Sequence, residues 1–282
     1  AIPKTVDNDL VITDSCPGFG SAAKYIATST LEGSLDVQSM SESSTKVFIL
    51  EVMGRHAGWM AASSALARSE HQSAPHIILL PEITFNQKRF LDEVRGCVKN
   101  EGYCVVVVSE GVRNYRGNFL AESDTKDAFG HAQLGGVAPF ISNLVSKNLK
   151  MKNHWAVADY LQRSARHIAS QTDLEHAQAV GRYAVKYAVE GMNGTMPVIK
   201  RLPTKSYSWS IEPAPLSKIA NLEKKLPKNF ITKNGFGVTK KGIEYLQPLI
   251  EGEAKIAFKN GLPEIKKLKL ELVKKKLEAW DI

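Results

Sequence analysis

Three short runs of apolar residues restrict the folds open to this chain of 282 residues more than any other feature. Residues 46–53, 75–80 and 103–108 are almost entirely apolar and rich in branched side chains. Such runs are typical of parallel strands that helices cover on both faces. A segment with helical spacing of apolar residues, 90–98, lies between the second and third runs. This alternation predicts an α/β fold in three layers, with helices flanking a parallel sheet.

Further helices are predicted at residues 139–148 and 173–191, and an amphipathic helix at 263–280. In the last of these, Ile265 and Leu272 fall on one side and lysines elsewhere. Amphipathic helices are the usual covering of a globular domain, so we expect this one to dock on its own domain or on a partner subunit. Binding to a membrane surface or to a nucleic acid is the alternative.

The net charge of +8 is concentrated at the C-terminal end of the sequence. Residues 224–282 contain 14 Lys and seven acidic residues, a surplus of +7. The charge therefore belongs to a C-terminal extension and not to the site that the rest of the chain builds, so it does not indicate an anionic substrate. No apolar run approaches the roughly 18 residues of a membrane span. The three cysteines form neither a CxxC pair nor a disulfide framework. We expect a soluble, cytoplasmic protein with no membrane or nucleic-acid partner.

The segment PKTVDND, residues 3–9, carries two carboxylates and a lysine. Asp7 and Asp9 are two positions apart, and Lys4 precedes them. One carboxylate can accept a proton while the other lies near a metal or fixes the geometry, and the lysine can neutralise developing negative charge. This set of groups suits phosphoryl transfer. The alternative is a turn rich in Asp and Asn that joins a strand to a helix.

The segment EVMGRHAGW, residues 51–59, places Gly54 and Arg55 directly after a predicted strand and before a helix. Glycine allows a ligand to approach the backbone closely, and a guanidinium can bind a phosphate or a sugar hydroxyl through two hydrogen bonds. The pattern therefore favours a sugar-phosphate pocket. The alternative is a simple strand–helix turn in which Arg55 is only solvated.

In order and spacing, PKTVDND and EVMGRHAGW resemble the catalytic turn and the sugar-phosphate turn of the 6-phosphofructokinases. Ser109-Glu110-Gly111 resembles the turn whose glutamate contacts the fructose hydroxyls. The segment YLQR, residues 160–163, resembles the one whose arginine binds the 6-phosphate. The resemblance covers about residues 1–202. It implies two similar Rossmann-like lobes with the active site between them.

The resemblance also implies a reaction, the phosphorylation of fructose 6-phosphate at C1 in glycolysis. The catalytic residues would be Asp7 as general base, Lys4 and Asp9. The expected substrate-binding residues are Thr5, Val6, Asp7, Met53, Gly54, Arg55, Glu110, Tyr160, Leu161, Gln162 and Arg163. ATP-using members usually have a small residue in place of Lys4, and a lysine there resembles the pyrophosphate-dependent branch. We therefore expect pyrophosphate as the donor. The alternatives are an ATP-dependent kinase and a non-catalytic, regulatory subunit that binds the sugar phosphate.

The glycine-rich donor loop of the family, with its Mg²⁺-binding aspartate, precedes the catalytic turn, and no residues before Ala1 supply it. We expect Mg²⁺ as cofactor, with its main ligand in a companion chain or in a lost N-terminal segment. The expected assembly is a homo-oligomer or a complex with such a companion. Three domains are expected. Residues 1–150 would form the rest of the donor-side lobe together with the sugar-phosphate lobe. Residues 151–202 would contain the YLQR segment and its helix, and residues 203–282 would form a basic helical extension.

Two glycine motifs are weaker. GHAQLGG, residues 130–136, resembles a phosphate turn of the family, but Leu134 stands where an arginine is needed, so we assign 6-phosphate binding to Arg163. GFGSAA, residues 18–23, matches a dinucleotide fingerprint, but Pro17 interrupts the short apolar stretch before it. We expect no NAD site. The seven histidines lack the spacing of metal ligands, so no metal site made by the protein alone is expected.

Overall fold

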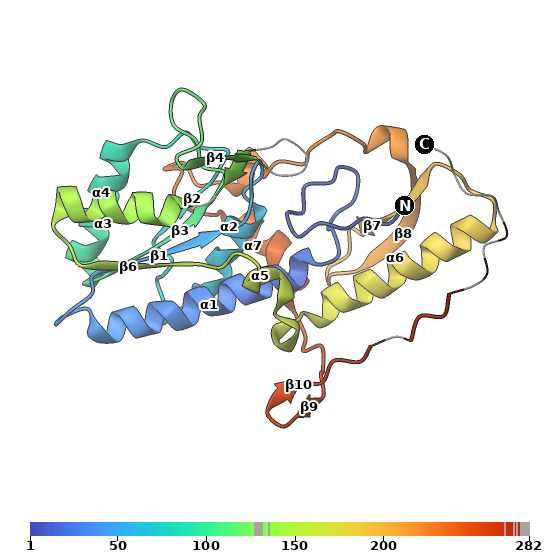
Figure 1. Ribbon diagram of the computed structural model, residues 1–282. Helices are drawn as coiled ribbons and strands as arrows, with labels where there is room; N and C mark the ends of the chain where they lie inside the picture. The colour runs from blue at the N-terminus through green and yellow to red at the C-terminus, as the bar shows by residue number, and fades with distance from the viewer. Residues whose placement is uncertain (127–131, 135, 268, 273, 275, 277–282) are drawn as a thin grey trace.

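The computed structural model describes residues 1–126, 132–134, 136–267, 269–272, 274 and 276. Figure 1 shows an α/β part at one end of the molecule and a smaller part, built on one long helix, at the other. The N-terminal loop passes between the two parts.

The α/β part is built on a four-stranded sheet in the order β2-β3-β1-β6. Its strands are β1 (Val47–Val52), β2 (Ile77–Leu79), β3 (Cys104–Ser109) and β6 (Asn153–Val157). All three pairings, β1 with β3, β1 with β6 and β2 with β3, are parallel. The three strands predicted from the apolar runs are confirmed. The fourth, β6, escaped prediction because it is an edge strand that is mostly exposed and has no long apolar run.

Helices cover both faces of this sheet, which confirms the three layers. Neighbouring residues of a strand point to opposite faces, and they divide between two apolar clusters accordingly. Leu50 packs with Ile26 of α1 (Phe19–Met40), in a cluster that also includes α2 (Trp59–Ser63) and Leu246 of α7 (Lys240–Leu246). Ile49 packs with Val94 of α3 (Gln87–Glu101) and Ile141 of α4 (Val137–Leu149).

The smaller part is centred on α6 (Gln171–Val189), which packs against β7 (Thr195–Arg201) and β8 (Trp209–Pro215). These two strands pair antiparallel. In place of a second parallel sheet, the described residues therefore contribute an antiparallel pair here. The helices predicted at 139–148 and 173–191 are confirmed as α4 and α6. Strands β7 and β8 lie on either side of residue 202 and pair with each other. The expected domain boundary at residue 202 stays a prediction.

The remaining elements are short. They are α5 (Leu161–Ser164), β4 (Glu122–Lys126), β5 (Ala132–Leu134), β9 (Phe258–Lys259), β10 (Leu262–Pro263) and the 3-10 helices η1 (Ser64–Ala67), η2 (Arg166–Ile168), η3 (Leu216–Lys218), η4 (Lys228–Phe230) and η5 (Gln247–Ile250). Among the described helices, none is both long and apolar enough to cross a bilayer.

The amphipathic helix predicted for residues 263–280 is wrong in the part that the structure describes. The described residues that follow β10, up to residue 276, are not helical. Ile265, Leu270 and Leu272 are strongly exposed, so the apolar stripe has no surface to pack on in this chain. Because an isolated helix of this length is marginal in water, the apolar pattern is not sufficient to form it.

Candidate functional site

The PKTVDND segment forms a partly buried turn in the middle of the molecule, where the N-terminal loop passes between the sheet and α6 (Figure 1). Lys4 is exposed, Asp7 and Asp9 are half-buried, and Asn8 between them is buried. Asn8 has φ 54°, in the left-handed region that Asn tolerates better than most residues. The chain therefore turns sharply between the two carboxylates. The backbone N–H of Asp7 donates to Thr5 Oγ1 at 3.1 Å, which holds the turn closed.

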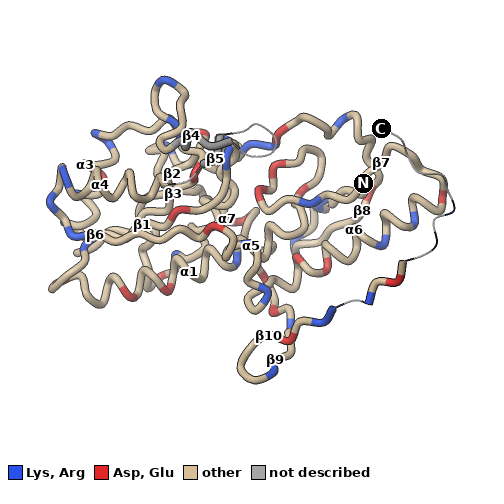
Figure 2. The backbone as a smooth tube through the Cα atoms, viewed as in Figure 1, with Lys and Arg blue, Asp and Glu red and all other residues tan. Residues whose placement is uncertain are grey.

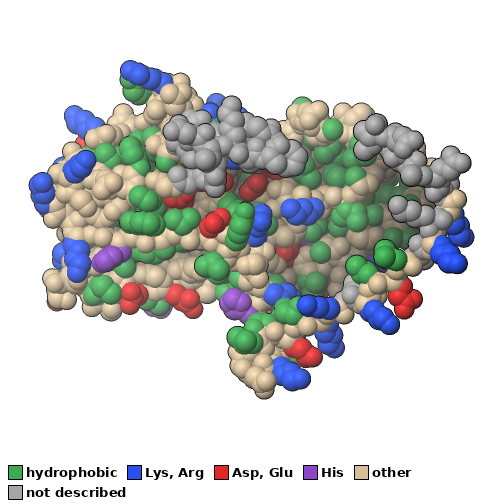
Figure 3. Space-filling model, in the orientation of Figure 1, with side chains coloured by type: hydrophobic (Ala, Val, Ile, Leu, Met, Phe, Trp, Pro, Cys, Tyr) green, Lys and Arg blue, Asp and Glu red, His purple; other side chains and the backbone are tan. Residues whose placement is uncertain are grey.

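The charges around Asp7 come from several segments of the chain. Burial raises the pKa of Asp7, and the neighbouring charge of Asp9 raises it further. The positive charges of Lys4, Arg55 and His56 lower the pKa of Asp7. The structure thus brings Lys4 and Arg55, predicted from separate motifs, close enough to act on one carboxylate. Acidic and basic residues gather accordingly in the middle of the molecule (Figures 2 and 3).

The sugar-phosphate turn follows β1, and Glu110 follows the neighbouring strand β3. Because the two strands are parallel neighbours, their carboxyl ends meet at one edge of the sheet, where ligands bind in such folds. The Gly54 N–H donates to Glu110 Oε1 at 3.2 Å, and Ser109 Oγ donates to the Gly54 carbonyl at 2.6 Å. Gly54 has φ 134°, and a Cβ there would lie 2.8 Å from the Ala57 carbonyl oxygen. Only glycine fits this turn.

The pKa of Glu110 is raised to about 6, mainly by burial. The hydrogen bond from Gly54 and the charge of Arg55 lower the pKa, while the charges of Asp7 and Glu51 raise it. Glu110, Arg55 and Asp7 therefore interact with one another. The sequence predicted all three as site residues.

This raised pKa makes the stability depend on pH. The native state holds the Glu110 proton more tightly than the unfolded chain, in which the ordinary value is 4.5. Native stability is therefore lost as the pH rises from about 4.5 to about 6, by up to about 2 kcal/mol. A Glu110→Gln variant, which cannot ionise, should gain about this much relative to the wild type between pH 4 and pH 8. Urea unfolding at both pH values measures the gain, and a constant difference between the two proteins would contradict the assignment.

The YLQR segment reaches the sugar-phosphate turn through Gln162. Its side-chain oxygen Oε1 accepts from the Met53 N–H at 3.3 Å, and its Nε2 donates to the Asp159 carbonyl at 2.9 Å. Gln162 is buried, whereas Tyr160 and Leu161 are each 62% exposed. The exposed Arg163 places its guanidinium carbon 4.1 Å from the centre of the Tyr160 ring, a stacking contact that orients it.

Lys4 and Arg163 line two adjoining cavities. Lys4 lines one of about 390 Å³, and Arg163 lines one of about 230 Å³. The two linings share Gly18, Ser21, Arg166, Ala169 and Asp173. Lys4 and Arg163 thus face neighbouring cavities that share a wall, and Asp7, Arg55 and Glu110 line neither of the two. Val6 packs against the apolar cluster that includes residues of α1, and its contact with the substrate stays a prediction.

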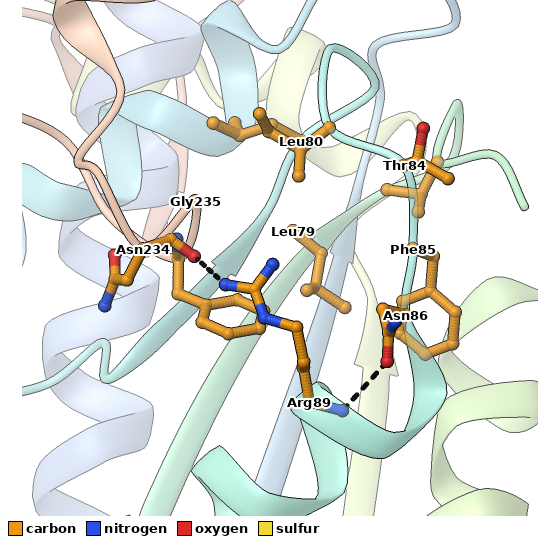
Figure 4. A pocket seen from close by; sticks show the side chains of 11 residues that line it. Leu79, Leu80, Thr84, Phe85, Asn86, Arg89, Asn234 and Gly235 are labelled. Atoms are coloured by element: carbon orange, nitrogen blue, oxygen red, sulfur yellow. Dashed lines mark hydrogen bonds between the residues drawn. The ribbon is translucent and has the colours of Figure 1, made fainter. Parts of the chain in front are cut away.

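A small gap beside β2 lies outside these two cavities. Figure 4 shows it between β2, the start of α3 and the loop that contains Asn234. Arg89 Nη2 donates to the Asn234 carbonyl at 2.9 Å, and Asn86 Oδ1 accepts from the Arg89 N–H at 3.0 Å (Figure 4). At about 10 Å³ the gap holds no more than one water molecule, so it is a packing feature. In GHAQLGG at 130–136, residues 130, 131 and 135 lie outside the described residues.

Asp173 of α6 was not predicted, although it lines both cavities. Its carboxylate accepts from the backbone N–H groups of Gly18 and Ser21 at 2.8 and 3.1 Å and from the Ser21 hydroxyl at 2.5 Å. It therefore caps the first turn of α1, where a negative charge is favourable. This carboxylate occupies the helix start that the GFGSAA motif would offer to a dinucleotide phosphate.

Removing this cap should destabilise the protein. Asp173→Ala leaves the donors at the start of α1 without a partner, which should lower the free energy of unfolding by about 3 kcal/mol. Asp36→Ala, which truncates an exposed carboxylate on the same helix, should change it by less than about 0.5 kcal/mol. Urea unfolding of the two variants measures the difference. Equal effects would show that Asp173 does not cap the helix.

Comparison of this chain with known protein families assigns it to the family that its sequence motifs resemble. The sequence model of the Phosphofructokinase family matches residues 1–188. The chain belongs to the phosphofructokinase family. It is 56% identical over 281 residues to a pyrophosphate–fructose 6-phosphate 1-phosphotransferase of Halomonas elongata, an alignment that covers 100% of this chain and 67% of the relative.

Two solved structures of family members are similar throughout this chain. The pyrophosphate-dependent phosphofructokinase of Marinobacter aquaeolei superposes with a TM-score of 0.87 at 56% identity, covering 98% of this chain and 66% of that one. That of Nitrosospira multiformis superposes with a TM-score of 0.90 at 54% identity, covering 100% and 68%. The chain thus spans about two thirds of the length of these phosphofructokinases.

Proposed function

We propose that this phosphofructokinase transfers a phosphoryl group from pyrophosphate to the C1 hydroxyl of fructose 6-phosphate. The products are fructose 1,6-bisphosphate and phosphate, and the reaction serves glycolysis. The observation that carries the proposal is the position of Lys4, whose charge acts on Asp7. The names of the relatives at 54–56% identity support it.

Asp7 is the general base of the proposed reaction. As the C1 oxygen attacks the nearer phosphorus of pyrophosphate, the proton of the hydroxyl passes to the Asp7 carboxylate, and the bond from that phosphorus to the bridging oxygen breaks. Burial and Asp9 raise the pKa of Asp7, which makes it a stronger base than an exposed aspartate. Lys4 lowers the pKa of Asp7, which favours the ionised form, and would stabilise negative charge on the transferring group.

The sugar phosphate is held by groups from the carboxyl ends of β1 and β3 and from α5. The charges of Arg55 and Asp7 both act on Glu110, and Arg55 and Glu110 would contact the sugar hydroxyls. Arg163, oriented by Tyr160, would bind the 6-phosphate through two hydrogen bonds. Met53, Gly54 and Gln162 form the hydrogen-bonded frame behind these side chains. Holding the substrate in this way accounts for much of the rate enhancement in phosphoryl transfer.

The carboxylates of Asp7 and Asp9 fit a role for Mg²⁺. The pKa values of both are raised, mainly by burial, and the charge of Asp9 also raises the pKa of Asp7. A divalent cation beside them would offset the cost of burying two neighbouring negative charges. Oxygen ligands are those that Mg²⁺ prefers. Across the described ranges, no three His, Cys, Asp or Glu residues form a metal cluster. Asp9 would therefore be a supporting ligand beside the phosphates, and the ion would neutralise charge on the donor.

A donor exchange tests the proposal. The full-length protein is assayed with fructose 6-phosphate and either pyrophosphate or ATP, each with Mg²⁺. Turnover with pyrophosphate at least 100-fold faster than with ATP is expected, because Lys4 stands where ATP-using members have a small residue. Faster turnover with ATP would identify an ATP-dependent kinase. Binding of the sugar phosphate without turnover on either donor would identify a regulatory subunit.

A further inference from the structure

Lys224 lies directly behind the catalytic turn, outside the residues that the family model matches. Its Nζ donates to the carbonyl oxygens of Asp14 and Thr13 at 2.8 and 3.0 Å and to the side-chain oxygen of Asn8 at 3.3 Å. Its backbone N–H donates to the Asp9 carbonyl at 2.6 Å. The ammonium thus meets three acceptors, the number that it can satisfy.

Asn8 is the residue on which these contacts converge. Its Oδ1 also accepts from the Cys16 N–H at 3.0 Å, and its Nδ2 donates to the Tyr245 hydroxyl at 3.1 Å. Both ends of its amide are therefore bonded while its backbone is held at φ 54°. Because Asn8 lies between Asp7 and Asp9, its conformation sets the direction in which both carboxylates point.

The same segment also contacts the sugar-phosphate turn. The indole N–H of Trp59 donates to the Lys224 carbonyl at 2.8 Å, and Lys224 Nζ lies 5.2 Å from the centre of the Trp59 ring. One residue before Lys224, the Glu223 carboxylate pairs with His56 Nδ1 at 2.5 Å. Residues 223–224 therefore bond both to the turn that carries Asp7 and to the residues that follow Arg55.

We propose that Lys224 is a positioning residue, which holds Asn8 in its left-handed conformation and so keeps the Asp7 carboxylate aligned with the hydroxyl that it deprotonates. The proposal rests on the proposed function. The contacts of Lys224 on this loop are with Asn8, Asp9, Thr13 and Asp14, which all follow Asp7, and they do not include Arg163 or Glu110. Loss of the ammonium should therefore reduce the chemical step while sugar binding is kept, since a misplacement of about 1 Å can cost roughly 100-fold in rate.

The test is Lys224→Met in the full-length protein. Methionine keeps the aliphatic contact with Trp59 and loses the three donors. We expect kcat to fall 10- to 100-fold, with the KM for fructose 6-phosphate within threefold of the wild type. Amide exchange should accelerate in the peptide that contains residues 5–16 when followed by mass spectrometry. Exchange reports on the turn without any assay of activity, so it tests the positioning role even if the proposed reaction fails.

Two further variants complete the design. Lys225→Met removes the adjacent exposed lysine and should leave both kcat and exchange unchanged. Asn8→Ala combined with Lys224→Met should lower kcat no more than Asn8→Ala alone, because the two residues act as one unit. Additive losses in the double variant would overturn the proposal. So would a Lys224→Met protein with wild-type exchange in residues 5–16, or one with a kcat within twofold of the wild type.

Discussion

Asp7→Asn should lower kcat by about 10²- to 10⁴-fold, the range that a general base contributes. The amide has nearly the same shape as the carboxylate, but it cannot accept the proton of the C1 hydroxyl. The sugar phosphate is held mainly by Arg55, Glu110 and Arg163, so its dissociation constant should change by less than about threefold. Steady-state kinetics and calorimetric titration with fructose 6-phosphate give the two quantities.

The matched control for this variant is Asp14→Asn, which changes a carboxylate farther along the same loop. Asp14 pairs with Arg201 at 3.1 Å and is not assigned a role with the substrate. Its replacement should affect stability more than turnover. An Asp7→Asn protein with activity within tenfold of the wild type would remove Asp7 from the role of base.

Lys4→Met should lower kcat by about 10²- to 10³-fold with pyrophosphate, the cost of losing one charged donor at the transferring group. The variant should also shift the pH dependence of kcat. Lys4 lowers the pKa of Asp7, so its removal should raise that pKa. Because the base acts only when ionised, the acidic limb of the profile should move to higher pH.

Lys4→Arg separates charge from geometry. Arginine preserves the positive charge, so it should leave the acidic limb near its wild-type position, while its planar group replaces a compact ammonium and should still slow turnover. An unchanged kcat in Lys4→Met would refute the assignment of Lys4 to the donor.

The sheet was predictable because its strands are buried on both faces. Residues 47–52 and 104–109 contain little except branched apolar side chains, and this pattern has few other interpretations. Strand β6 lies at the sheet edge and has no such pattern. The prediction of a C-terminal helix was wrong because a periodic apolar stripe forms a stable helix only when it packs against another surface.

The candidate site was predicted where the chemistry resides in short motifs, and missed where it depends on distant contacts. Lys4, Asp7, Arg55 and Glu110 stand in recognisable turns. Lys224 was counted only as the first residue of a basic extension, because nothing in the local sequence shows that it reaches Asn8, 216 positions earlier. The left-handed conformation of Asn8 could have been inferred from an asparagine between two aspartates, since this residue type tolerates the left-handed region.

A crystal structure of the full-length protein with fructose 6-phosphate tests the central arrangement most directly. The account predicts that the C1 hydroxyl lies within about 2.6–3.2 Å of an Asp7 carboxylate oxygen. It also predicts that the guanidinium of Arg163 forms hydrogen bonds with the 6-phosphate and that Lys4 faces the side of C1 at which the donor binds. A sugar bound with C1 remote from Asp7, or with its phosphate away from Arg163, would contradict the account.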